Sequence, residues 1–224
     1  MNGNISNSAT TITLTDASSF NSAGKIKINN EIIAYTGKST NNLTGCTRGQ
    51  NSTTAAAHTS GATVDQVVET VSGLTHLEGQ TVSVLADGST HPTKVVSSGS
   101  VSLDRPSKKV KVGLKFDSVL QTMRIDAGSQ NGTSQGKTKR IYEVTVRLFE
   151  TVGVEVGPEL NNMERIPFRT SANPMDQGIP PFTGDKEVEF RGNYDTDGFI
   201  FVRQTQPLPL TILSLYPRLV TNDG

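Results

Sequence analysis

Apolar and polar side chains alternate along most of this chain, and that period of two is the feature that most limits what it can fold into. Successive side chains of a β-strand point to opposite faces, so alternation buries one face and leaves the other in water. Alternating segments cover residues 11–16, 25–28, 31–35, 80–87, 108–116, 141–151 and 186–190. Residues 198–204 and 210–219 are more continuously apolar, as expected of strands covered on both faces. The pattern predicts an all-β fold.

Turn residues separate these segments. Asn29 and Asn30 lie between two of them, and asparagine tolerates the positive φ of a tight hairpin. Further turns are expected at 86–90 and 97–100. Helical spacing is not sustained over several turns anywhere, and the best short helix candidate is Asp117–Met123, with Asp117 as its cap. Short strands joined by frequent turns favour an antiparallel sandwich or barrel.

A change in composition near residues 62–71 divides the chain. Before it, threonine, serine, asparagine and glycine are frequent and bulky side chains are few; after it, the alternation is more regular. We predict a small, barrel-like module of β-hairpins at residues 1–64 and an antiparallel β-sandwich at residues 65–224. Within the sandwich, the proline-rich segment Glu159–Gly184 is expected to be a long irregular loop that packs on a neighbouring subunit or on its own domain.

Charge and cysteine content exclude several classes of protein. The chain has 21 basic and 21 acidic residues, so it lacks the basic excess of a nucleic-acid-binding protein. Its single cysteine permits no internal disulfide, which fits folding inside a cell. No apolar run approaches the roughly 20 residues that span a bilayer, and no secretion signal is recognisable at the start. We expect no membrane insertion.

The segment "GSQNGTSQGKTKR" (128–140) resembles the end of a phosphate-binding P-loop but does not meet its requirements. A P-loop has four residues between its first glycine and its Gly-Lys-Thr, which puts that glycine at position 131; the chain has Asn131 there, and Gly132 is one residue too close. The residues that follow alternate as a strand, whereas a P-loop opens a helix whose N–H groups hold the phosphate. We predict a flexible glycine-rich loop at Gly128–Gly136 that leads into a strand, and no nucleotide binding.

The segment Asn193–Gly198 matches half of a calcium-binding loop. Asn193, Asp195, Asp197 and Gly198 have the spacing of its first half. The position that should hold a bidentate glutamate is Gln204, and no helices flank the segment. Aspartate-rich turns are ordinary between strands, so we predict no metal and no cofactor, and any ion bound here would be a structural calcium.

No catalytic arrangement stands out. Cys46 with His58, His76 or His91 could form a nucleophile and base, but no pair has ligand spacing and the segment "GCTRGQ" has no helix start around it. A structural role is expected for all four residues. No particular pair of carboxylates indicates glycoside hydrolysis, whose geometry the fold would set. We predict that the chain is not an enzyme.

Five long segments carry a resemblance to a known family. They are "GLTHLEGQTVSVLADGSTHPTKVV" (73–96), "VKVGLKF" (110–116), "GTSQGKTKRIYEVTVRLFETVGVEVGP" (132–158), "IPFRTSANPMDQGIPPFTGDKEVEF" (166–190) and "YDTDGFIFVRQTQPLPLTILSLYPRL" (194–219). Together, over 72–219, they resemble the C-terminal region of the tail nozzle proteins of short-tailed bacteriophages, also called tail tubular protein B. Nozzle proteins carry a β-propeller-like body before this region, so the chain is either a piece of a longer protein or a shorter relative.

The first part of the chain resembles a different module. Residues 11–64, beginning "TITLTDASSF", are similar to the small β module named after the FCCH domain of ubiquitin-activating enzyme, which occurs as an insert in phage structural proteins. The resemblance implies no ubiquitin chemistry. It does imply that Cys46 is a small buried side chain in a turn.

The resemblance implies a viral structural protein of the phage tail that acts by assembly. Nozzle proteins form a closed homo-oligomeric ring, such as a hexamer, that extends the DNA exit channel below the adaptor. The implied partners are copies of the chain, the phage adaptor and tail-fibre or spike proteins, with DNA passing through without sequence-specific binding. The implied location is the virion, after assembly in the host cytoplasm.

Two sets of residues are expected to contact neighbouring subunits. A proline-rich extended arm loses less entropy on docking than a flexible one. Basic side chains after the glycine-rich loop are also available to a neighbour. The predicted contact residues are Arg165, Ile166, Pro167, Phe168, Arg169, Pro174, Pro180, Phe182, Lys137, Lys139 and Arg140.

Two other functions remain open. The first is a host-surface binding module of the tail tip that recognises polysaccharide through residues 1–64. Such sites present aromatic platforms, and this part of the chain offers only Phe20 and Tyr35. The second is a depolymerase, which would need a pair of carboxylates in a cleft, one of them with a raised pKa.

Overall fold

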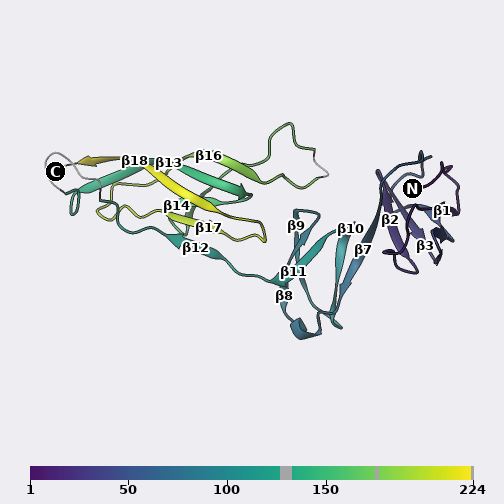
Figure 1. Ribbon diagram of the computed structural model, residues 1–224. Coiled ribbons are helices and arrows are strands. Elements are labelled where there is room, and N and C mark those ends of the chain that lie inside the picture. Colours follow the sequence, from purple (N-terminus) through teal and green to yellow (C-terminus); the bar gives the residue numbers. More distant parts are fainter. Residues whose placement is uncertain (127–132, 175–176, 223–224) are drawn as a thin grey trace. The chain divides into compact units, whose positions relative to one another are not determined.

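The computed structural model describes residues 1–126, 133–174 and 177–222. Within them the chain forms 18 strands and one short 3-10 turn, η1 (Thr75–Leu77), so the prediction of an all-β fold is confirmed (Figure 1). In the part of the chain that is described, no helix has the length and apolar character needed to cross a membrane. The predicted helix at Asp117–Met123 is wrong, because Ser118–Gln121 is strand β12 and pairs with a neighbouring strand.

Two small sheets make up the N-terminal module. The strands are β1 (Thr11–Thr13), β2 (Gly24–Ile28), β3 (Glu31–Tyr35), β4 (Gly37–Ser39), β5 (Asn42–Thr44) and β6 (Thr47–Gln50). One sheet has the order β1-β5-β4, and the other contains β2-β3-β6. Asn29 adopts a φ of 53° in the β2–β3 turn, as the hairpin prediction requires. Apolar side chains of both sheets, among them Ile12, Ile26, Ile33 and Leu43, form a common buried core.

Strand β7 (Val64–Ser72) lies where we predicted a domain boundary. Its first half pairs with β2, with Val64 opposite Ile28, and its second half pairs with β10 (Ser100–Ser107). The chain contacts therefore divide the protein elsewhere, into one unit of residues 1–79 with 95–110 and a second of residues 80–94 with 111–224. The predicted division between residues 64 and 65 falls inside β7 and would separate this strand from β2, its partner in the sheet of the N-terminal module.

The next sheet along the chain has three strands. Its strands are β8 (Thr81–Ala86), β9 (Ser89–Val95) and β11 (Val110–Leu114), in the order β11-β8-β9. The turn between β8 and β9 consists of Asp87 and Gly88, with φ values of 51° and 76°. Both residues of a type I′ turn need positive φ, which is why the Asp-Gly pair forms a tight hairpin here.

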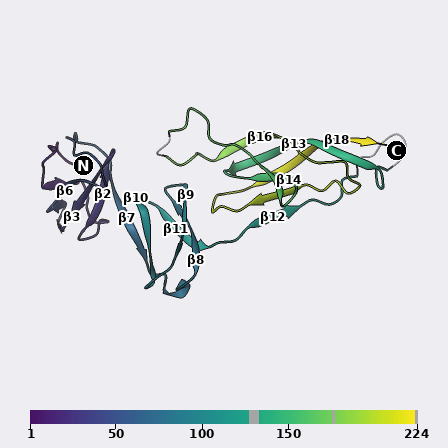
Figure 2. The same cartoon turned by 180° about the vertical axis from the view of Figure 1, so that it is seen from behind.

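The rest of the second unit contains two antiparallel sheets that share one core (Figure 2). One sheet has the order β12-β17-β14-β15, where β17 is Phe201–Gln204, β14 is Glu155–Glu159 and β15 is Asn162–Arg165. The other has the order β16-β13-β18, where β16 is Phe182–Glu189, β13 is Thr138–Thr151 and β18 is Ile212–Asn222. We call these the four-stranded and the three-stranded sheet of the sandwich.

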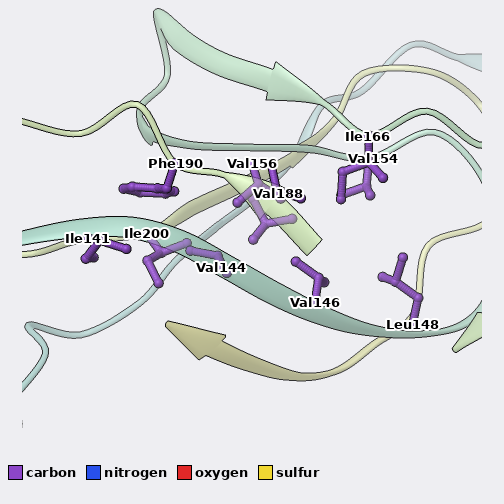
Figure 3. Packing of buried hydrophobic residues seen from close by; sticks show 11 residues of the cluster. Ile141, Val144, Val146, Leu148, Val154, Val156, Ile166, Val188, Phe190 and Ile200 are labelled. Carbon is purple, nitrogen blue, oxygen red and sulfur yellow. The ribbon is translucent and has the colours of Figure 1, made fainter. Parts of the chain in front are cut away.

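The core of the sandwich follows the alternation of β13. Val144, Val146 and Leu148 are fully buried on one face of this strand. They lie in one cluster with Val156 of β14 and Ile200, which precedes β17 (Figure 3). Such side chains contribute about 1.5–3 kcal/mol each when removed from water. The alternation that predicted a strand at 141–151 therefore also marks the face that holds the two sheets together.

The proline-rich segment is shorter than predicted. Residues 155–159 and 162–165 form the β14–β15 hairpin, and β16 already begins at Phe182. Only residues 166–181 lack strand structure where they are described. The loop was overestimated because Pro158 and the Asn161–Asn162 pair give turn signals inside and beside short strands.

We predict that Leu148→Ala destabilises the second unit by about 2–5 kcal/mol, because it leaves a cavity in the sandwich core. Leu148 has no exposed surface. Leu160→Ala is the matched control, since Leu160 is 44% exposed in the β14–β15 turn and its truncation should change stability by no more than about 0.5 kcal/mol. Urea unfolding followed by far-UV circular dichroism measures both. Equal losses in the two variants would contradict the assignment of Leu148 to the core.

Candidate assembly surface

Among the described residues, no three or more His, Cys, Asp or Glu side chains are placed to hold a metal ion. In the half-motif at Asn193–Gly198, Asp195 accepts a hydrogen bond from the N–H of Gly198 at 3.4 Å. Asp197 lies 3.0 Å from the guanidinium Nε of Arg124. Asp195 thus makes a contact within the turn, and Asp197 pairs with a basic side chain from another segment.

A buried carboxylate, Glu31, is the centre of the densest polar network in the N-terminal module. It is 2% exposed, and Arg48 reaches it with Nε at 2.8 Å and Nη2 at 2.7 Å. His58 Nε2 lies 2.7 Å from the same carboxylate. The backbone N–H groups of Gly49 and Ala56 donate to it at 3.0 and 3.2 Å. All four neighbours lie 17 or more residues further along the chain, so Glu31 ties β6 and the loop after it to β3.

Hydrogen bonds fix the pKa of Glu31. Burial alone would raise this pKa from 4.5, but hydrogen bonds from Arg48, from His58 and from the backbone of Ala56 and Gly49 outweigh burial and lower the pKa to about 2. Glu31 is therefore ionised at neutral pH. A carboxylate held in this state accepts hydrogen bonds but cannot act as a general acid.

The partner of His58 on its other side assigns its tautomer. Asn29 Nδ2 lies 3.3 Å from His58 Nδ1, and an amide nitrogen can only donate. His58 Nδ1 is therefore the acceptor, and Nε2 carries the proton donated to Glu31. With both ring nitrogens engaged, His58 has no lone pair to offer a substrate. The prediction of a structural role for this histidine agrees with these contacts.

Cys46 is not arranged as a nucleophile. It is 6% exposed, and its thiol lies 3.4 Å from the carbonyl of Leu43, to which it donates. Burial raises the pKa of this thiol, and the nearby charge of Arg48 offsets only part of that effect. Since the thiolate is the reactive form, a raised pKa makes the residue inert. Cys46 occupies the core of the module as a small buried side chain.

Ile166 is not available to a neighbouring subunit. It is 3% exposed and packs in the sandwich core, and its N–H donates to the carbonyl of Val154 at 3.0 Å. The prediction of a subunit contact at Ile166 is therefore wrong, because this residue continues the inner face of the sandwich. Its neighbour Arg165 is exposed and lies 3.8 Å from Glu155 across the β14–β15 hairpin.

Phe168 and Phe182 pack on their own sandwich. Their rings meet edge to face, with centroids 6.2 Å apart, and both pack against the core cluster. Lys186 Nζ lies 4.6 Å from the ring of Phe182 and 5.8 Å from that of Phe168. Such cation–π contacts contribute about 0.5–1 kcal/mol near a surface. The two ends of the proline-rich segment are thus held together within one chain.

Arg169 closes the loop between these ends. Its guanidinium donates to the carbonyls of Pro174 at 2.7 Å and Gln177 at 3.0 Å. Of the two arrangements expected for the proline-rich segment, the contacts within the chain favour the one folded back on its own sandwich. Pro167, Pro174 and Pro180 remain exposed and are the members of this set that a neighbour could reach.

The basic residues after the glycine-rich loop differ from one another in exposure. Lys139 is 2% exposed, and its Nζ donates to the carbonyl of Ile125 at 2.8 Å, so the prediction that it contacts a neighbour is wrong. Its backbone pairs with Asp195 in an isolated bridge. Lys137 is half-buried and Arg140 is exposed. Of the predicted loop at Gly128–Gly136, residues 128–132 lie outside the described residues.

A strip of exposed apolar side chains was missed by the sequence reasoning. Phe116 is 77% exposed and Met123 is 87% exposed, and three further residues of the same segment are about half exposed. We define the apolar strip as Leu114, Phe116, Val119, Leu120 and Met123. Isolated exposed apolar residues are normal, but a concentration of them indicates an interaction surface. The signal was the adjacent pair Val119–Leu120, which cannot both face one core from a strand.

No model of a known protein family matches the chain, and a search of curated proteins finds no similar protein.

We predict that acid removes the stabilisation supplied by Glu31. Because its folded pKa lies below the ordinary 4.5, this contribution is complete above about pH 4.5 and is lost as the pH falls toward 2. Its full size is about 3 kcal/mol at about 1.4 kcal/mol per pKa unit. Glu31→Gln should lose about 3–5 kcal/mol at pH 7, since Arg48 stays buried without a counter-charge.

The control for Glu31→Gln is Glu69→Gln, which breaks the partly exposed pair with Lys25 at 2.7 Å. Exposed pairs contribute up to about 1 kcal/mol, so this variant should stay close to the parent. Urea unfolding at pH 7 and pH 3, with hydrogen exchange to report on the N-terminal module, distinguishes the two. An unchanged pH dependence in Glu31→Gln would overturn the assignment.

Proposed function

We propose that this chain is a structural component of a bacteriophage tail, acting by assembly into a homo-oligomeric ring that forms part of the DNA exit channel. The resemblance of residues 72–219 to nozzle proteins supports the place in the tail. The adaptor and the tail fibres or spikes are the proposed neighbours of the ring. The proposal involves no bond-making, in keeping with the structural contacts of Cys46, His58 and Glu31.

The apolar strip is the observation that carries the proposal of assembly. Its five side chains fall within ten residues, 114–123, and leave apolar surface in water that a partner would cover. Burial of apolar surface contributes about 25 cal/mol per Å², and it is the main favourable contribution to most protein association.

The charge balance supports a channel role. With 21 residues of each sign, the chain has no net attraction for phosphates. DNA binding gains affinity by releasing counterions at clustered Lys and Arg, and such affinity would retard DNA during transit. A neutral protomer is therefore suited to a ring through which DNA moves.

Polysaccharide binding is a second candidate function. The feature that favours it lies in the sandwich and not in residues 1–64, where we expected the site. Tyr35 is 2% exposed and Phe20 packs on the module core, so residues 1–64 present no aromatic platform from these two residues. The sandwich has a cavity of about 640 Å³ lined by Tyr194, Phe199 and Phe201 together with polar side chains. Aromatic faces combined with amides are suited to sugars.

We predict that the ring is the form of the chain in solution. Light scattering coupled to size exclusion should give one species whose mass is a whole multiple of 23.9 kDa, independent of dilution over about tenfold. A single chain mass at every concentration would contradict the proposal.

The second candidate function predicts that Tyr194→Ala abolishes retention on a glycan array while leaving the oligomeric mass unchanged. Tyr194 is 54% exposed, so its truncation spares the fold. Tyr142→Ala, at 43% exposure and outside the cavity, is the matched control. No binding by the parent chain would remove this candidate.

A further inference from the structure

Strand β12 is an unprotected edge of the four-stranded sheet. It pairs with β17 on one side, and no strand of the described residues pairs with its other side. Natural edge strands are blunted by charges, proline or bulges, and "SVLQ" has no charged residue or proline. By contrast, the opposite edge β15 carries Glu164 and Arg165, and β16 carries Asp185, Glu187 and Glu189.

Both faces of β12 are uncovered. Leu120 lies opposite Val202, whose side chain is 1% exposed in the core, so Leu120 is on the inner face of the sheet. It is nevertheless 47% exposed. Val119 lies opposite Arg203 on the outer face and is 49% exposed. The sandwich therefore leaves apolar side chains of the strip uncovered on both faces of β12.

A second apolar patch lies on β18. Leu213, Tyr216 and Val220 are 59%, 49% and 45% exposed. Tyr216 lies opposite Thr145 of β13, which in turn lies opposite Glu187 of β16, so these three side chains share the outer face of the three-stranded sheet. That face thus carries an apolar stripe along β18.

The same outer face carries an acidic stripe along β16. Asp185, Glu187 and Glu189 lie opposite Arg147, Thr145 and Glu143 of β13. Arg147 pairs with Asp185 at 2.7 Å, and this contact lowers the pKa of Asp185. Glu187 and Glu189 form no ion pair with any described residue. Two carboxylates of the acidic stripe are therefore available to a partner.

The apolar strip has the opposite charge around it. Lys111, Lys115 and Arg124 lie within or beside it, and Asp117 is the one acidic residue between positions 111 and 124. Arg124 is paired with Asp197 at 3.0 Å, whereas Lys111 forms no ion pair within the described chain and Lys115 approaches Asp117 only to 3.9 Å. An apolar and basic segment thus exists on the same chain as a sheet face that carries an apolar stripe along β18 and an acidic stripe along β16.

We propose that the apolar strip of one copy docks on the outer face of the β16-β13-β18 sheet of the next copy, with Lys111 and Lys115 beside Glu187 and Glu189. This proposal depends on the ring of the proposed function, and it identifies the two surfaces that meet between neighbouring copies. Because the surfaces are different, the contact is head to tail, and such contacts form a ring when the rotation between neighbouring copies closes. Charge complementarity fixes the orientation of the strip on the sheet.

Variants on the two surfaces test this contact. Leu120→Lys and Leu213→Lys each place a charge in the apolar part of one surface, and each should reduce the mass from the ring to the 23.9 kDa of a single chain. Leu160→Lys, on a residue 44% exposed outside both surfaces, should remain a ring. Circular dichroism confirms that each variant is folded, which is expected because all three side chains are exposed.

Mixing distinguishes a head-to-tail contact from any other. Leu120→Lys keeps an intact sheet face and Leu213→Lys keeps an intact strip, so equal amounts of the two should form a dimer that grows no further. A mixture that stays at the single-chain mass would overturn the proposal. So would a parent ring that survives both substitutions, an outcome that leaves the proposed function standing. A parent chain that is a monomer throughout would remove both.

The charged part of the contact has its own test. Lys111→Glu with Lys115→Glu should weaken the ring at least about tenfold in the concentration at which it dissociates, and Glu187→Lys with Glu189→Lys should do the same. All four changes in one chain should restore assembly toward that of the parent, because opposite charges again face each other. Two losses without rescue would show that these residues do not face each other.

Discussion

The backbone ladder of β13 is the interaction on which the second unit depends. This strand of 14 residues pairs with β16 on one side and β18 on the other, and its buried face supplies Val144, Val146 and Leu148 to the core. The same pairing aligns the outer face, where the acidic stripe of β16 and the apolar stripe of β18 lie on either side of it. The inner face of the β16-β13-β18 sheet thus belongs to the core, and its outer face is the sheet surface of the proposed contact.

The sequence predicted the strands best where the alternation of apolar and polar side chains was long. Residues 141–151 were expected as a strand and lie within β13, since a period of two over so many residues has no other stable arrangement. Residues 117–123 were expected as a helix and include β12 instead. The spacing of Val119, Leu120 and Met123 fits one helix face, but the same residues fit an edge strand whose two faces are both uncovered, and local pattern cannot distinguish these cases.

The candidate contact residues show where sequence reasoning fails. Ile166 and Lys139 were chosen for their place in a loop and in a basic cluster, and both are buried. A lysine normally stays in water, so its burial at Lys139 depends on a carbonyl from Ile125, 14 residues away, which no local pattern reveals. Glu31 was missed for the same reason, because its partners come from β6 and later loops.

The discontinuity of the first unit gives its folding an order in time. The partner of the second half of β7 is β10, so residues 80–94 must be synthesised before the first unit, which consists of residues 1–79 and 95–110, can be completed. Until residue 107 has left the ribosome, half of β7 is a bare edge able to pair with another nascent chain. If the proposed ring forms, its copies would be made together and would meet in that interval, so the spacing of translating ribosomes would bear on the yield of correctly folded subunits.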